Sequence, residues 1–131
     1  IPFQAHYSAS KAAIEALVMA LANELHAFDV FVGLIEPGDI DTPFNDGMDW
    51  GEPDGASPYA EQAGRTELAI REALPLAPGP GIVADAVAHA LGARRPRVRY
   101  AVGREAWLVG LGRRLLTDRL SLRIIRDHFG L

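Results

Sequence analysis

Apolar residues recur at helical spacing over the first part of the chain. Within residues 5–28 they fall at i, i+3, i+4 and i+7, which keeps them on one face of an α-helix, at Ile14, Leu17, Val18, Leu21, Leu25 and Phe28. The pattern stops at Asp29 and gives way to an apolar run over residues 30–35, which Pro37 and Gly38 end. We expect a helix over 5–28 followed by a buried strand of a parallel sheet.

Further helices and one more strand are expected beyond residue 38. Residues 39–56 are rich in Asp, Gly and Pro, which is typical of a long loop. Helical spacing returns from residue 57 or 58 to about 74 and again over 82–93, and the prolines and glycines of 75–81 separate the two. Residues 98–102 alternate like a strand, and 104–129 predict one or two amphipathic helices. The expected fold class is therefore α/β, rich in helices, with about two strands.

Composition narrows the classes of protein to consider. The 131 residues are 49% apolar, which suits one packed unit. No apolar run approaches the roughly 20 residues that span a bilayer. The absence of Cys removes disulfides, thiol catalysis and Cys-ligated metals. The four histidines show no metal-ligand spacing, so we expect no metal site, and we expect a cytoplasmic protein.

The net charge of −4 is divided unevenly along the chain. Residues 1–93 carry 3 basic residues against 14 acids, whereas residues 94–131 carry 10 arginines against 3 acids. Such a basic tail suits solvated helix faces or an anionic surface; we expect no nucleic-acid partner. Lys11 is the only lysine, which suggests that it lies where arginine would not serve.

Tyr7 and Lys11 lie four residues apart, which puts both side chains on one face of the expected helix. A free phenol has a pKa of about 10 and is a poor base at neutral pH, but a nearby ammonium stabilises the phenolate. A tyrosine in that setting can exchange a proton with an alcohol or ketone oxygen. Taken alone, the spacing is more typical of a solvated helix face. The surrounding sequence must therefore decide between that interpretation and a catalytic pair.

The context comes from the residues that follow the apolar strand. Tyr7-x-x-x-Lys11, that strand and Pro37-Gly38-x-x-x-Thr42 together resemble the short-chain dehydrogenase/reductase family, and residues 96–103 resemble the last strand of its sheet. The resemblance implies the C-terminal portion of a Rossmann-type doubly wound parallel sheet. It also implies an oxidoreductase that uses NAD or NADP to interconvert an alcohol and a ketone or aldehyde.

The resemblance implies a role for each matching residue. Tyr7 would be the catalytic acid/base, and Lys11 would hold the nicotinamide ribose and favour the phenolate. Pro37 and Gly38 would turn the chain past the nicotinamide. An ordinary turn that ends a strand is the alternative for this dipeptide.

The loop after the turn would contact the cofactor and the substrate. By resemblance, Ile40 would approach the carboxamide with its backbone, and the Thr42 hydroxyl would bind the carboxamide or a phosphate; a helix cap is the alternative for Thr42. Met48, Trp50 and Tyr59 would line an apolar substrate pocket, unless they merely pack a surface loop. We expect residues 1–131 to form one partial domain, with 39–66 as the substrate loop and 104–131 as a basic helical tail.

Parts of the family pattern are absent from these 131 residues. They contain no glycine-rich phosphate loop, no residue that would choose between NAD and NADP, and no catalytic serine before the tyrosine. We therefore expect the chain alone to be inactive. We also expect the open edge of its sheet to be covered by self-association into a homo-oligomer.

Two alternatives remain beside the enzyme that acts on a small apolar alcohol or ketone. One is a non-catalytic dimerisation or interaction module derived from such an enzyme. The other is a protein that binds a membrane surface through the arginine-rich tail and Trp107, and this property is compatible with the enzyme.

Overall fold

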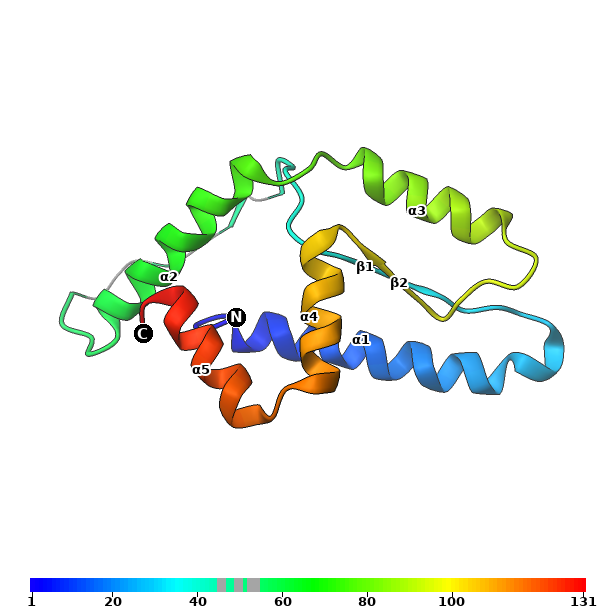
Figure 1. Ribbon diagram of the computed structural model, residues 1–131, viewed down its shortest axis with the longest axis horizontal. Coiled ribbons are helices and arrows are strands. Elements are labelled where there is room, and N and C mark those ends of the chain that lie inside the picture. Colours follow the sequence, from blue (N-terminus) through cyan, green and yellow to red (C-terminus); the bar gives the residue numbers. More distant parts are fainter. Residues whose placement is uncertain (45–46, 49–50, 52–54) are drawn as a thin grey trace.

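Two short parallel strands are surrounded by helices (Figure 1). A computed structural model describes residues 1–44, 47–48, 51 and 55–131. In chain order the elements are α1 (Ala5–Glu24), the 3₁₀ turn η1 (His26–Phe28), β1 (Leu34–Pro37), α2 (Ala60–Ala73), the 3₁₀ turn η3 (Leu74–Leu76), α3 (Gly81–Gly92), β2 (Arg99–Val102), α4 (Arg104–Leu115) and α5 (Asp118–Phe129). The expected helix-rich α/β fold is confirmed.

The direction of the first helix and strand positions the rest of the chain. After α1 the chain reverses, and β1 runs back toward the beginning of α1 (Figure 1). β2 pairs with β1 in parallel, with Leu34 opposite Arg99 and Pro37 opposite Val102. A parallel pair needs a crossover, which here includes α3. The first turn of α1 and the carboxyl ends of both strands therefore lie at the same end of the sheet.

The first strand lies later in the sequence than expected. The apolar run predicted a strand over 30–35, but β1 spans Leu34–Pro37. Its ladder begins where the Leu34 N–H donates to the Val98 carbonyl over 2.8 Å. The prediction was wrong by four residues at its start because β2 begins only after Pro96, and a strand extends only as far as its partner.

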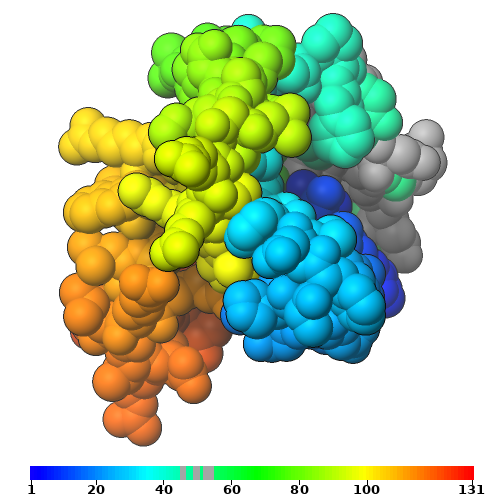
Figure 2. All heavy atoms as spheres, turned by 90° about the vertical axis from the view of Figure 1, so that its right-hand side faces the viewer, coloured from blue at the N-terminus to red at the C-terminus, as the bar shows by residue number. Residues whose placement is uncertain are grey.

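α1 turns one stripe of side chains toward the sheet. Glu15, Val18, Leu21 and Leu25 are half-buried at helical spacing, whereas Leu17 is exposed. Seen from the end of α1, its last residues (light blue) lie beside the segment that leads into β2 (yellow), and α4 (orange) projects away from them (Figure 2). One face of α1 is thus sheltered from solvent, and it includes Glu15, whose carboxylate binds Arg99 of β2.

The two last helices confirm the expected helical tail. α4 begins directly after Gly103, whose φ of 89° suits glycine. α5 packs against α2 at the far side of the molecule (Figure 1). Within the described residues, no helix combines the length and apolar character that crossing a bilayer requires.

The chain buries few side chains completely. Among the described residues, Val102 and Thr66 are the buried ones. The accessible surface is 10217 Å², against about 6,700 Å² for a folded monomer of this mass. Two four-residue strands are too small for the helices to enclose a large core. Much apolar surface therefore stays open on α1, α3, α4 and α5.

Val102 should carry more stability than other valines. Its side chain is 7% exposed, so Val102→Ala should lower the free energy of unfolding by about 2 kcal/mol through lost burial and the cavity left behind. Val109→Ala is the matched control, because Val109 is 63% exposed and should change stability by less than about 0.5 kcal/mol. Urea unfolding followed by circular dichroism measures both, and equal losses would contradict the assignment of the core.

Gly38 should be required for the seating of α4. A Cβ at this position would lie 3.3 Å from the Ala106 nitrogen and from the Glu105 Cβ, so Gly38→Val should displace the start of α4 and destabilise the chain by about 1–3 kcal/mol. The control is Gly79→Val, because a Cβ at Gly79 meets nothing within 4 Å. Thermal unfolding compares the two variants, and an unchanged midpoint for Gly38→Val would refute this role.

Candidate functional site

Tyr7 and Lys11 lie in the first two turns of α1. The Lys11 Nζ is 5.2 Å from the centre of the Tyr7 ring, within the range of a cation–π contact. Tyr7 is 47% exposed and Lys11 is also exposed. No carboxylate among the described residues forms an ion pair with Lys11. The phenol and the ammonium are therefore adjacent, accessible and available to a ligand.

Ser10 lies between these two residues but points its hydroxyl elsewhere. Its Oγ donates a hydrogen bond to the Tyr7 carbonyl over 2.8 Å. A serine in a helix often bonds the preceding turn in this way. The hydroxyl is thus held by the helix backbone, beside the Tyr7 main chain.

The segment after β1 is held by two backbone hydrogen bonds. The Gly38 N–H donates to the Val102 carbonyl over 3.0 Å, and the Asp41 N–H donates to the Pro78 carbonyl over 3.0 Å. The first bond continues the ladder to the end of β2, and the second joins the segment to the chain before α3. Both fix the path of residues 38–41.

The residues expected to border a cofactor lie on this segment. Pro37 is exposed, and Gly38, Ile40 and Thr42 are half-buried. Because β1 runs antiparallel to α1, the segment lies at the end of the sheet where α1 begins (Figure 1). A Cβ at residue 38 would also lie only 3.3 Å from the Ala106 nitrogen at the start of α4, so packing against α4 favours glycine there.

The end of the proposed substrate segment is helical, as the spacing from residue 57 or 58 predicted. Residues 60–66 belong to α2, so the helix takes the last part of the segment 39–66. Met48 is half-buried and Tyr59 is exposed, and the Tyr59 ring meets Phe3 edge to face with centres 6.2 Å apart. Trp50 lies outside the described residues. Tyr59 therefore reaches the segment that leads into α1.

Sequence reasoning missed a cluster of four charged residues from four elements. The Arg99 Nη1 on β2 donates to the Glu15 Oε2 on α1 over 3.2 Å and to the Glu36 Oε1 on β1. The Arg113 Nη1 on α4 lies 3.4 and 3.3 Å from Oε1 and Oε2 of Glu15. One signal was present in the sequence: Glu15 interrupts the apolar stripe of α1 four residues after Lys11.

The two carboxylates favour the charged form of Arg99. Desolvation lowers the pKa of Arg99, but the hydrogen bond from Arg99 to Glu15 and the negative charges of Glu36 and Glu15 outweigh it, so its pKa lies above the ordinary value. An arginine is a permanent cation in any case, and this one lies between α1 and β1.

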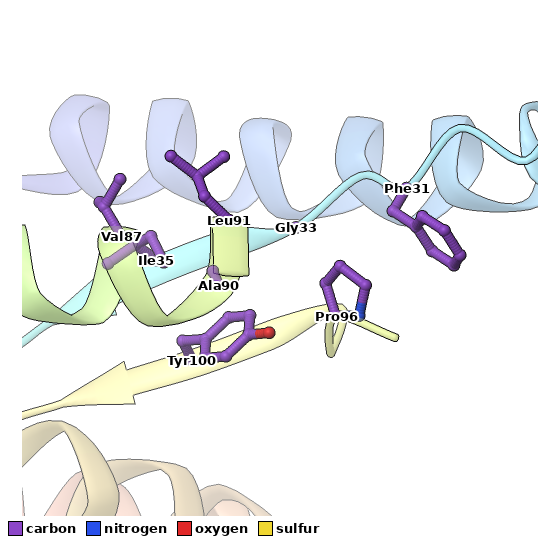
Figure 3. Close-up of a pocket in the computed structure, with 8 residues that line it drawn as sticks. All are labelled: Phe31, Gly33, Ile35, Val87, Ala90, Leu91, Pro96 and Tyr100. Atoms are coloured by element: carbon purple, nitrogen blue, oxygen red, sulfur yellow. The ribbon is translucent and has the colours of Figure 1, made fainter. Parts of the chain in front are cut away.

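A hollow of about 220 Å³ lies at the other end of the sheet. Its lining comes from α3 and from the residues around the starts of the strands (Figure 3), namely Phe31, Gly33, Ile35, Val87, Ala90, Leu91, Pro96 and Tyr100. The Tyr100 hydroxyl accepts a hydrogen bond from the Arg97 N–H over 2.8 Å. Because its lining is apolar apart from the Tyr100 hydroxyl and it lies away from Tyr7, we assign the hollow to open packing under α3.

Comparisons of the sequence with known proteins point to one family. Residues 1–52 match the family described as short chain dehydrogenase. The chain is 37% identical over 125 residues to the uncharacterized oxidoreductase YbbO of Escherichia coli, covering 95% of this chain and 43% of that protein. It is 35% identical to a 3-ketodihydrosphingosine reductase of Bacteroides thetaiotaomicron, over 79% of this chain and 39% of the relative.

A third relative is matched over nearly the whole chain. It is the NADPH-dependent 3-dehydrocapnine reductase of Ornithobacterium rhinotracheale, 33% identical over 94% of this chain and 44% of the relative. The chain thus spans about two fifths of the length of these curated relatives. By its matched residues and its relatives, the chain belongs to the short-chain dehydrogenase/reductase family.

Proposed function

We propose that this chain carries the proton-transfer part of the active site of an NAD(P)-dependent oxidoreductase that interconverts an alcohol and a ketone or aldehyde. The observation that carries the proposal is the Tyr7–Lys11 pair, with the ammonium 5.2 Å from the ring centre and both side chains open to solvent. Membership of an oxidoreductase family supports it.

Tyr7 would exchange the proton at its Oη. In the direction of reduction, the phenol gives its proton to the carbonyl oxygen as negative charge develops there. The phenolate that remains is stabilised by the Lys11 ammonium beside the ring. In the direction of oxidation the same phenolate accepts the alcohol proton. A bound nicotinamide supplies or accepts the hydride at the substrate carbon.

The residues present fit a nicotinamide cofactor. An ammonium has three donors, and in the described part of the chain no carboxylate engages those of Lys11, so it would hold the ribose hydroxyls. Pro37, Gly38, Ile40 and Thr42 would border the nicotinamide. The name of the 3-dehydrocapnine reductase supports NADPH as the form to test first.

The substrate we propose is a bulky apolar alcohol or ketone. The names of two relatives, reductases of 3-ketodihydrosphingosine and 3-dehydrocapnine, support a ketone on a larger molecule. Met48, Trp50 and Tyr59 remain the residues proposed to line its pocket. Of these, Tyr59 meets Phe3, which lies four residues before Tyr7.

The alternative is a non-catalytic association module. The large accessible surface favours it, because a chain with this much open apolar surface gains stability by pairing with another. A homo-oligomer is compatible with both functions and is proposed for both.

Tyr7→Phe separates the enzyme from the association module. The test protein is a hybrid in which this chain replaces its matched segment of the NADPH-dependent 3-dehydrocapnine reductase. Loss of the hydroxyl removes the proton donor, so turnover of the ketone should fall by roughly a hundredfold to ten-thousandfold. Oxidation of NADPH, followed by absorbance, measures it.

The matched control is Tyr100→Phe in the same hybrid, since Tyr100 lines the hollow under α3, away from Tyr7, and its hydroxyl accepts a hydrogen bond from the Arg97 N–H. Its turnover should stay within a few-fold of the parent hybrid. A folded hybrid that binds NADPH but loses nothing on Tyr7→Phe would exclude the catalytic role.

The 131-residue chain on its own should neither bind NADPH at micromolar concentration nor reduce a ketone. Its sequence contains no Gly-x-Gly-x-x-Gly segment to hold the pyrophosphate. Isothermal titration with NADPH and with NADH measures this, and the hybrid serves as the positive control. Micromolar binding by the isolated chain would show that its own residues suffice.

A further inference from the structure

Lys11 and Glu15 are natural partners that do not pair. They lie four residues apart on one face of α1, where opposite charges attract. Between these two described residues there is nevertheless no ion pair. The Lys11 Nζ lies over the Tyr7 ring instead, and Glu15 turns toward the sheet.

The Glu15 carboxylate is fully engaged by two arginines. Arg99 on β2 reaches Oε2 at 3.2 Å, and Arg113 on α4 lies within 3.4 Å of both oxygens. The Glu15 side chain is only 24% exposed, so water cannot replace both arginines readily. The same Nη1 of Arg99 also donates to Glu36 on β1, which ties the guanidinium to a second element.

We propose that Arg99 and Arg113 are positioning residues that hold the Glu15 carboxylate away from Lys11 and so keep the Lys11 ammonium on Tyr7. They act on the proton-transfer pair through Glu15 and contact neither member of it in the described interactions. Any effect of these arginines on catalysis rests on the proposed function. Their effect on the position of the Lys11 ammonium does not depend on it.

The proposal follows from what a freed Glu15 would do. A half-buried carboxylate without a partner is costly, so it binds the nearest remaining cation. On α1 that cation is Lys11, the only lysine of the chain, one turn away on the same face. The ammonium would then leave the Tyr7 ring and lie beside the Glu15 carboxylate, about one turn further along α1.

A single lysine makes the ammonium directly observable. In the 131-residue chain labelled with ¹³C-lysine, the only lysine Hε signals belong to Lys11. The nearby Tyr7 ring should shift them upfield, and Tyr7→Leu should abolish that shift and provide the reference. Arg99→Met and Arg113→Met together should remove most of the ring-current shift, because Lys11 moves toward Glu15.

Restoration by a third change distinguishes positioning from general support. Adding Glu15→Gln to the double variant removes the competing charge, so the upfield shift should return even though the ties between α1, β2 and α4 stay broken. A merely structural cluster would lose the shift further with each change. The matched control is Arg123→Met, because Arg123 pairs with Asp127 on α5 and should leave the Lys11 signals in place.

Each outcome decides the proposal. An unchanged Lys11 signal in the double variant, or no return of the shift with Glu15→Gln, overturns it. Should the double variant unfold, Arg113→Met alone gives the test, because Arg113 is well exposed and pairs with Glu15; a partial loss of the shift supports the proposal and no loss overturns it. The signals require no cofactor or substrate, so they remain informative even if the Tyr7→Phe hybrid disproves catalysis.

Discussion

Arg99 joins the helix that bears Tyr7 and Lys11 to the two strands. From β2 its guanidinium binds Glu15 of α1 and Glu36 of β1 together. No side chain of α1 is fully buried, so the helix depends on these ion pairs and on one half-buried stripe for its orientation. Even at exposed sites an ion pair contributes only about 0.2–1 kcal/mol, and these part-buried pairs also lose hydration. Their main effect is therefore on the orientation of α1. That orientation sets the position of the Tyr7 phenol relative to the sheet.

The parallel register of the strands brings the other part of the site to the same end. Pro37 pairs with Val102, and the Gly38 N–H continues the ladder. In open α/β sheets, ligands bind outside the carboxyl ends of the strands. Because α1 runs against β1, its first turn is at this edge, and so the proposed acid/base pair and the proposed cofactor segment share one end of the molecule. The hollow under α3 lies at the opposite end of the sheet.

The openness of the chain also bears on the proposed reaction. Tyr7 is 47% exposed, whereas proton transfer in an enzyme works best in a site that excludes water. The described residues of this chain do not cover the phenol, and the chain spans about two fifths of its curated relatives. Tyr7 and the apolar faces of the helices therefore need the same thing, which is shielding from water. Either a longer chain or a second copy of this chain would provide it.

The sequence by itself determined the helices, the two strands and the Tyr7–Lys11 spacing. These follow from local periodicity and from turn residues such as Gly38, which act over a few positions. Tertiary structure alone decided where β1 begins, because its length depends on a partner that starts after Pro96 some sixty residues later. It also decided the partner of Glu15. By sequence its neighbour is Lys11, but folding brings Arg99 and Arg113 to it from distant elements, and long-range contacts of this kind leave no periodic signal along the chain.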